Sequence, residues 1–267
     1  MQRITTDSMD YWLAGDGPPL LILHGGGASA EALLGLAERI GTGYRVLVPN
    51  LAGYGRNASL DDARPALEQH LATVRRAIAM CDGPIDLVGH SMGGFMALRA
   101  ASQWPERVRR LVAVEPMCFG TLHTGDPADG QALAEDRAAI DALVRLVDSG
   151  ETEAGVAAFI GYWGGAPWAA LPEHVRARLI AMGQQLRREA HETSYDRTPA
   201  SAYASLGKRT FLLAGEDSPL PASRIVARLA EAMPGVQTAT IANAGHMSVV
   251  MQPDLFAPAI RSFLTAG

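Results

Sequence analysis

Residues 85 to 93 read Ile85-Asp86-Leu87-Val88-Gly89-His90-Ser91-Met92-Gly93, a short apolar run followed by a Gly-x-Ser-x-Gly pentapeptide. The run predicts a buried strand, and residues 92–103 have the apolar spacing of a helix. A sharp turn from strand to helix strains the backbone at the serine, and the glycines let the two elements approach closely. The pattern therefore predicts that Ser91 is a nucleophile exposed above the carboxyl end of a sheet.

Strand-like and helical segments alternate along most of the remaining chain, which predicts a mostly parallel α/β sheet with helices on both faces. The polar stretch 2–13 is interpreted as an antiparallel hairpin at the sheet edge. The other strands are expected at 20–23, 44–48, 85–88, 108–114, 210–213 and 236–241, and the helices at 30–40, 63–80, 92–103, 222–232 and 254–263.

The alternation stops after Val114, and roughly ninety residues pass before the next strand, which is far longer than a simple crossover. Helical patterns cover 129–149, 151–161 and 172–189 in this interval. We therefore predict a core domain made of residues 1–116 and 208–267, with a helical cap inserted at 117–207.

Two further sequence motifs are expected at the same sheet edge as Ser91. The first is His24-Gly25-Gly26-Gly27, which follows a strand and predicts an oxyanion-hole loop. The donors are expected to be the N–H groups of Met92 and Gly26, with Gly25 as the alternative. The second is His246, which follows the last strand and predicts the general base, because an imidazole suits proton transfer near neutral pH. His90 is expected to point away from the site.

Together, these motifs and their order resemble the α/β-hydrolase superfamily, and the resemblance covers nearly the whole chain. It implies an eight-stranded sheet with a helical cap after the sixth strand. The pattern is similar to small capped esterases, C–C bond hydrolases and cofactor-free haloperoxidase-like members. The loop 49–56 also resembles the family's P-D-x-P-G-x-G loop, although Asn50 and Ala52 replace its Asp and second Pro; we interpret that loop as structural.

Two carboxylates are candidates for the acid that orients His246. Asp217 lies in a loop that resembles the family's G-x-x-D-x-x-x-P pattern, but it stands one residue early relative to Gly215, and Ser218 occupies the expected position. Glu115 ends the neighbouring predicted strand, and its longer side chain helps it to reach the histidine. Both remain candidates.

Aromatic side chains in the predicted cap suggest an apolar ceiling over the site, although each of them could instead pack the cap onto the core. As a group they favour a small or medium substrate with an apolar acyl or alcohol part. The candidate substrate-binding residues are Phe119, Tyr162, Trp163 and Trp168.

These features predict a serine hydrolase that acts on a carboxylic ester through an acyl-enzyme and needs neither metal nor organic cofactor. C–C bond hydrolysis, perhydrolysis or acyl transfer on the same triad is the alternative, and a non-catalytic small-molecule sensor is the alternative of another class. The net charge of −5 gives no reason to expect nucleic acid. Without an apolar leader or membrane-length run, we expect a cytoplasmic enzyme, monomeric or homodimeric.

Overall fold

The computed structural model describes residues 1–165 and 167–266; residues 166 and 267, which belong to the predicted cap and core, lie outside the described residues. The described chain forms one eight-stranded sheet in the order β1-β2-β4-β3-β5-β6-β7-β8. The strands are β1 (Gln2–Thr5), β2 (Asp10–Ala14), β3 (Pro19–Leu23), β4 (Arg45–Pro49), β5 (Ile85–His90), β6 (Val108–Val114), β7 (Thr210–Gly215) and β8 (Gln237–Ile241).

Only the N-terminal edge of this sheet is antiparallel. β1 pairs with β2 and β2 with β4 in antiparallel register, while the strands from β4 to β8 pair in parallel. Every residue of β5 and β7 is buried, as expected for parallel strands covered on both faces. The prediction of a mostly parallel, eight-stranded sheet with an edge hairpin is therefore confirmed.

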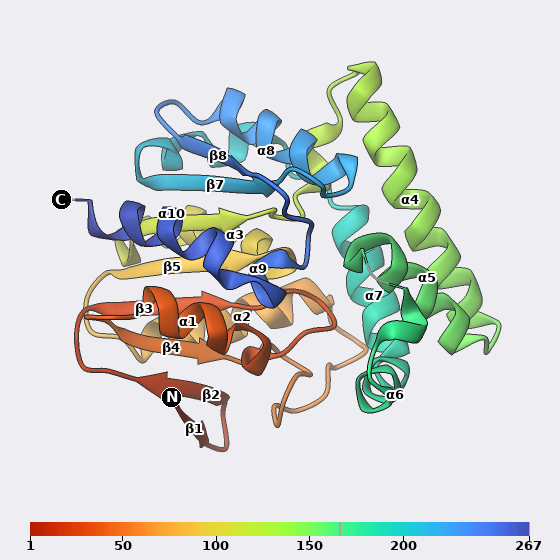
Figure 1. Cartoon of the computed structure of the whole chain (residues 1–267), viewed down its shortest axis with the longest axis horizontal. Helices are drawn as coiled ribbons and strands as arrows, with labels where there is room; N and C mark the ends of the chain where they lie inside the picture. Colours follow the sequence, from red (N-terminus) through yellow and green to blue (C-terminus); the bar gives the residue numbers. More distant parts are fainter. Residues whose placement is uncertain (166, 267) are drawn as a thin grey trace.

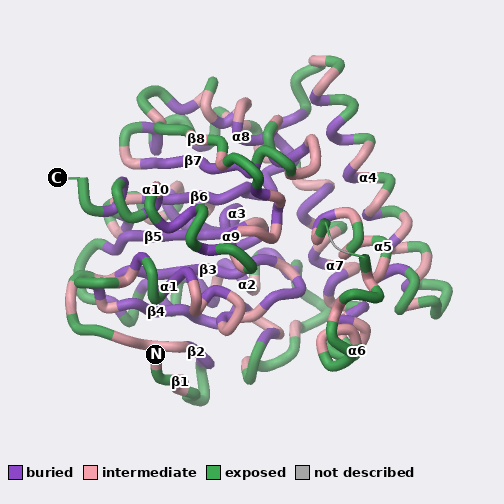
Figure 2. Tube along the Cα trace, in the orientation of Figure 1, coloured by how far each residue is buried: buried purple, intermediate pink, exposed green. Residues whose placement is uncertain are grey.

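Two layers of helices cover the sheet (Figure 1). One face packs against α1 (Leu34–Ile40), α9 (Ser248–Met251) and α10 (Pro253–Thr265), and the other against α2 (Ala66–Ala79), α3 (Met92–Gln103) and α8 (Leu220–Ala232). The tube in Figure 2 shows the central strands as almost continuously buried between these layers. The segment predicted as a helix at 30–40 begins with a 3₁₀ turn at Ala30–Leu33 before α1.

The segment between β6 and β7, residues 115–209, is called the insertion here. Its helices are α4 (Pro127–Asp148), α5 (Thr152–Gly164), α6 (Glu173–Ala181) and α7 (Gly183–Ser194), which gather beyond one end of the strands (Figure 1). The prediction of one helix at 172–189 is wrong, because the helix is interrupted at Met182, between α6 and α7. A Cβ on Gly183 would lie 2.3 Å from Cγ2 of Thr152 in α5, a tertiary contact that sequence periodicity does not reveal.

Ion pairs hold the start of the insertion against the sheet-bearing part of the chain. The buried Asp129 of α4 accepts hydrogen bonds from Nε of Arg224 at 2.8 Å and from Nε of Arg228 at 2.6 Å, and both arginines belong to α8. Arg228 also bonds Asp126, which caps the N-terminus of α4 through Ala128. The first turn of α4 is thus fixed to the helix that follows β7.

Within residues 1–165 and 167–266, no helix combines the length and apolar character needed to cross a bilayer.

Candidate active site

Ser91 lies at the turn between β5 and α3, where the backbone is strained. Its φ of 56° places a non-glycine residue at positive φ. Close packing surrounds it: a Cβ on Gly89 would lie 2.3 Å from the carbonyl oxygen of Gly93, and a Cβ on Gly93 would lie 2.4 Å from that of Leu23. The two glycines therefore allow β3, β5 and α3 to meet, which leaves Ser91 half-buried at the N-terminus of α3.

Three side chains from separate strand ends form a hydrogen-bonded series at this point. Oγ of Ser91, after β5, lies 3.1 Å from Nε2 of His246, after β8. Nδ1 of His246 lies 2.5 Å from Oε2 of Glu115, after β6. Glu115 and His246 are buried, and Glu115 shares with Ser91 a positive φ, here 46°. A hydroxyl, an imidazole and a carboxylate in this order can activate the hydroxyl as a nucleophile.

Of the two carboxylates that the sequence offers, Glu115 is the one that contacts His246. Its other oxygen, Oε1, accepts hydrogen bonds from the N–H of Gly215 and from Oγ of Ser218, each at 2.6 Å. Burial alone raises the pKa of Glu115, but the hydrogen bonds and the charge of His246 outweigh it and lower the pKa below its ordinary value. Asp217 is exposed, and its carboxylate accepts no hydrogen bond from the described residues. Ser218, at the position expected of the acid, supports Glu115 instead.

Two rings pack against His246. The ring centroid of Trp163, from α5, lies 4.8 Å from that of His246, and the ring centroid of His90 lies 4.6 Å from it. Nε2 of His90 also bonds the backbone carbonyl oxygen of His246 at 2.9 Å, so the expectation that His90 points away is wrong. The loop after β8 folds over the end of β5 and brings this carbonyl to the ring. Burial and the nearby His246 lower the pKa of His90 to about 3, which keeps its ring neutral at neutral pH.

The glycine loop after β3 passes directly beside Ser91. A Cβ on Gly25 would lie 2.9 Å from Cβ of Ser91. The N–H of Gly27 donates to the hydroxyl of Tyr54 at 2.9 Å, whereas the N–H groups of Gly26 and Met92 have no acceptor among the described residues. The loop therefore keeps the Gly26 N–H available for a ligand and commits that of Gly27 to the fold.

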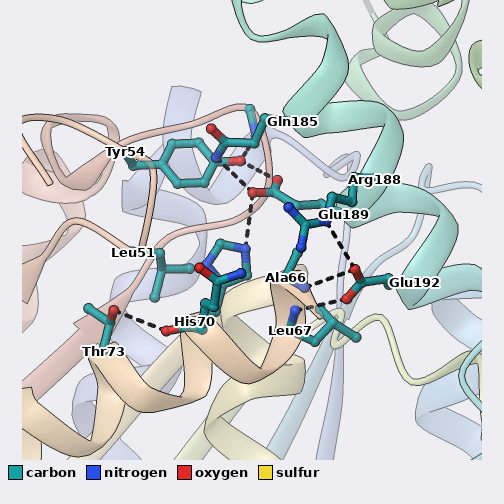
Figure 3. A network of polar contacts seen from close by, with 12 residues as sticks. Leu51, Tyr54, Ala66, Leu67, His70, Thr73, Gln185, Arg188, Glu189 and Glu192 are labelled. Atoms are coloured by element: carbon teal, nitrogen blue, oxygen red, sulfur yellow. Dashed lines mark hydrogen bonds and ion pairs between the residues drawn. The ribbon is translucent and has the colours of Figure 1, made fainter. Parts of the chain in front are cut away.

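Tyr54 connects this loop to a buried polar network centred on Glu189 of α7 (Figure 3). Its hydroxyl donates to Oε2 of Glu189 at 2.5 Å, while Nε2 of Gln185 and Nε2 of His70 lie 2.7 and 3.0 Å from Oε1. From the sequence, the loop that contains Tyr54 is expected to be structural only, and no motif marks Glu189. The two residues are 135 positions apart, so no local pattern could pair them; the only local signal is Tyr54 between two glycines.

An apolar cavity of about 310 Å³ opens beside Ser91 and His246. Its volume falls in the range of small-molecule sites. Of the predicted substrate-binding residues, Phe119 and Trp163 line it, whereas Tyr162 and Trp168 are not among the described residues of its wall. Trp168 instead donates to Glu153 at 3.1 Å. Other wall residues come from the glycine loop, from the start of α3 and from α4 to α7, and include Gly26, Met92, Ile140, Phe159, Leu179 and Leu186.

Comparison with known proteins agrees with this architecture. The model of the Alpha/beta hydrolase family matches residues 20–259. The chain belongs to the alpha/beta hydrolase family. This α/β-hydrolase is therefore an enzyme of that family, and the resemblance that the sequence suggested is confirmed.

Relatives of this α/β-hydrolase include esterase-like proteins. It is 28% identical to the pimeloyl-[acyl-carrier protein] methyl ester esterase of Xanthomonas campestris pv. campestris, over 94% of this chain and 97% of the relative. It is also 28% identical to the dihydrolipoyllysine-residue acetyltransferase component of the acetoin cleaving system of Cupriavidus necator, and there the match covers 94% of this chain but 64% of the relative. A hydrolase from Pseudomonas aeruginosa PA01 shares the fold, with a TM-score of 0.75 and 23% identity, over 99% of this chain and 98% of the other.

Proposed function

We propose that this α/β-hydrolase is a serine hydrolase of carboxylic esters. Ser91 attacks the ester carbonyl, His246 takes the serine proton, and Glu115 orients the imidazole and stabilises its protonated form. The observation that carries the proposal is the series of contacts from Ser91 through His246 to Glu115 at the wall of the cavity.

The oxyanion hole in this mechanism consists of the N–H groups of Met92 and Gly26. Negative charge develops on the carbonyl oxygen when Ser91 attacks, and fixed donors stabilise it because they need no reorganisation. Both N–H groups lack an acceptor among the described residues, and Gly25 is the alternative second donor. Water then hydrolyses the acyl-enzyme with His246 as base, which requires no metal or organic cofactor.

The substrate is proposed to be a small or medium, partly apolar ester. This proposal is supported by the size of the cavity and by the apolar side chains in its wall, among them Phe119 and Trp163. The relative from Xanthomonas campestris is named as a methyl ester esterase, which agrees with ester chemistry.

The test uses p-nitrophenyl esters of graded chain length together with a fluorophosphonate probe. We expect turnover that reaches a maximum at short or medium acyl chains, and labelling that maps to Ser91 and is absent from the Ser91→Ala variant. A folded protein that neither hydrolyses any ester nor takes the label would overturn the proposal and leave the sensor alternative.

A further inference from the structure

Two carboxylates in the insertion line the cavity, and their hydrogen bonding differs. Asp136 of α4 is 1% exposed and Glu189 of α7 is 2% exposed. Glu189 accepts hydrogen bonds from Tyr54, Gln185 and His70. Asp136 accepts only one, at Oδ2 from the hydroxyl of Ser194, and its Oδ1 has no partner among the described residues. One of the two carboxylates is therefore saturated, and the other keeps an unused acceptor.

A second unpartnered polar atom lies in the same part of the wall. Thr193 of α7 lines the cavity, is 6% exposed, and has a buried hydroxyl without a partner among the described residues. It directly precedes Ser194, whose side chain bonds Asp136. Folded proteins rarely leave buried polar atoms unpaired, because the loss of hydration is then uncompensated. An acceptor and a hydroxyl left open on neighbouring helices of a cavity wall indicate a ligand group that pairs with both.

The charge of Asp136 limits the choice of that group. Burial raises the pKa of Asp136 to about 7, and the hydrogen bond from Ser194 and the charge of Arg137 offset only part of that effect. A carboxylate on the ligand would be repelled by the ionised form of Asp136. An ammonium group would have to lose its hydration in a cavity whose wall is mostly apolar. A hydroxyl group fits both partners, because it can donate to Asp136 and accept from Thr193.

We propose that Asp136 and Thr193 form a subsite for a hydroxyl group that the substrate carries apart from its reacting ester. This subsite narrows the substrate class of the proposed function, and the inference rests on that function because it requires an ester in the cavity beside Ser91. The preferred substrates are then esters with an apolar chain that bears a hydroxyl, in the acyl or the alcohol part.

The first experiment measures binding without hydrolysis. In a Ser91→Ala background, thermal shifts are recorded with methyl esters of straight-chain acids, unsubstituted or with a hydroxyl placed at successive carbons, and with acetates of the corresponding diols. At one or more hydroxyl positions we expect a dissociation constant about ten-fold lower than for the unsubstituted ester. Thr193→Val and Asp136→Leu remove this preference, whereas Asp141→Asn, on the exposed face of the same helix, retains it.

The second experiment compares kcat/KM for the same ester pairs in the wild-type enzyme, and the two results separate the two proposals. Preferential binding of a hydroxylated ester without hydrolysis of any ester would overturn the proposed function and leave the subsite standing. Hydrolysis with equal affinity for hydroxylated and plain esters at every position would overturn the subsite alone. If Asp136→Leu does not fold, Thr193→Val decides the outcome, because it removes only the hydroxyl from a side chain of similar shape.

Discussion

Glu115 satisfies three donors at once, since one oxygen contacts His246 and the other accepts from Gly215 and Ser218. An amide at this position retains the shape but loses the charge that stabilises a protonated imidazole and selects its tautomer. We therefore expect Glu115→Gln to lower kcat for p-nitrophenyl esters on the order of 10³-fold or more, with little change in KM.

Asp217→Asn is the matched control, because Asp217 is an exposed carboxylate in the neighbouring loop. Its kcat should stay within about twofold of the wild-type value. If Asp217→Asn instead reduces kcat more than Glu115→Gln does, the acid has to be reassigned to Asp217.

Asp136 should make the stability of the protein depend on pH. Its pKa is about 7 in the folded protein and 3.8 as the ordinary value, so between these values the folded state holds a proton that the unfolded chain releases. The free energy of unfolding contributed by this group therefore decreases as pH rises from about 4 to above 7. The free energy of unfolding of Asp136→Asn, relative to that of the wild type, should therefore be higher at pH 8 than at pH 5, by on the order of 1–3 kcal/mol. Urea unfolding at both pH values measures the difference, and a constant difference would contradict the prediction.

Helix α7 contacts the N-terminus of α2 as well as the glycine loop. Pro65 precedes α2 and offers no side-chain cap, and the carboxylate of Glu192 takes that role by accepting from the N–H groups of Ala66 and Leu67 at 2.8 and 3.0 Å (Figure 3). Glu192→Ala should therefore destabilise the fold by about 1 kcal/mol, the usual cost of losing a helix cap. Glu192→Gln keeps an oxygen acceptor and should lose less in the same denaturation experiment.

Glu189 lies one turn earlier on the same helix and is fully buried within its network. Its removal leaves the Tyr54 hydroxyl and His70 without their shared acceptor, so Glu189→Ala should destabilise by about 3 kcal/mol. Because Tyr54 also accepts from Gly27, the variant should lower kcat even at temperatures where it stays folded. Equal kcat in folded Glu189→Ala and wild type would show that the network does not position the glycine loop.

Several contacts join the insertion to the rest of the molecule. Among them are the bonds of Asp129 to Arg224 and Arg228 of α8, of Glu189 to Tyr54, and of Glu192 to the N-terminus of α2. We therefore expect the chain to unfold in one cooperative transition. Tryptophan fluorescence in a variant that keeps only Trp163 and Trp168 reports on the insertion, and far-UV circular dichroism reports on the whole chain. Coincident midpoints are expected; an earlier fluorescence transition would show that the insertion melts independently, and Asp129→Ala should promote such a separation.

The sheet, its helices and the elbow at Ser91 could be predicted because each depends on local periodicity and turn chemistry. The interruption between α6 and α7 at Met182 could not be predicted, since it accompanies a contact between Gly183 and Thr152 that only the folded chain creates. The sequence also left two candidates for the carboxylate that contacts His246. Glu115 and Asp217 follow adjacent strands, and only the folded chain decides which side chain reaches the imidazole. The pairing of Tyr54 with Glu189 and that of Asp136 with Ser194 could not be predicted either, because each joins residues that are far apart in the sequence.

The packing of Trp163 against His246, with ring centroids 4.8 Å apart, gives the enzyme an internal optical reporter. An indole in contact with an imidazole loses fluorescence when the imidazole is protonated, because the cation accepts an electron from the excited ring. The emission of Trp163, isolated by subtracting a Trp163→Phe spectrum, should therefore follow the protonation of His246 directly. Stopped-flow records of that emission during a single turnover could then time proton transfer with no label and no chromogenic substrate.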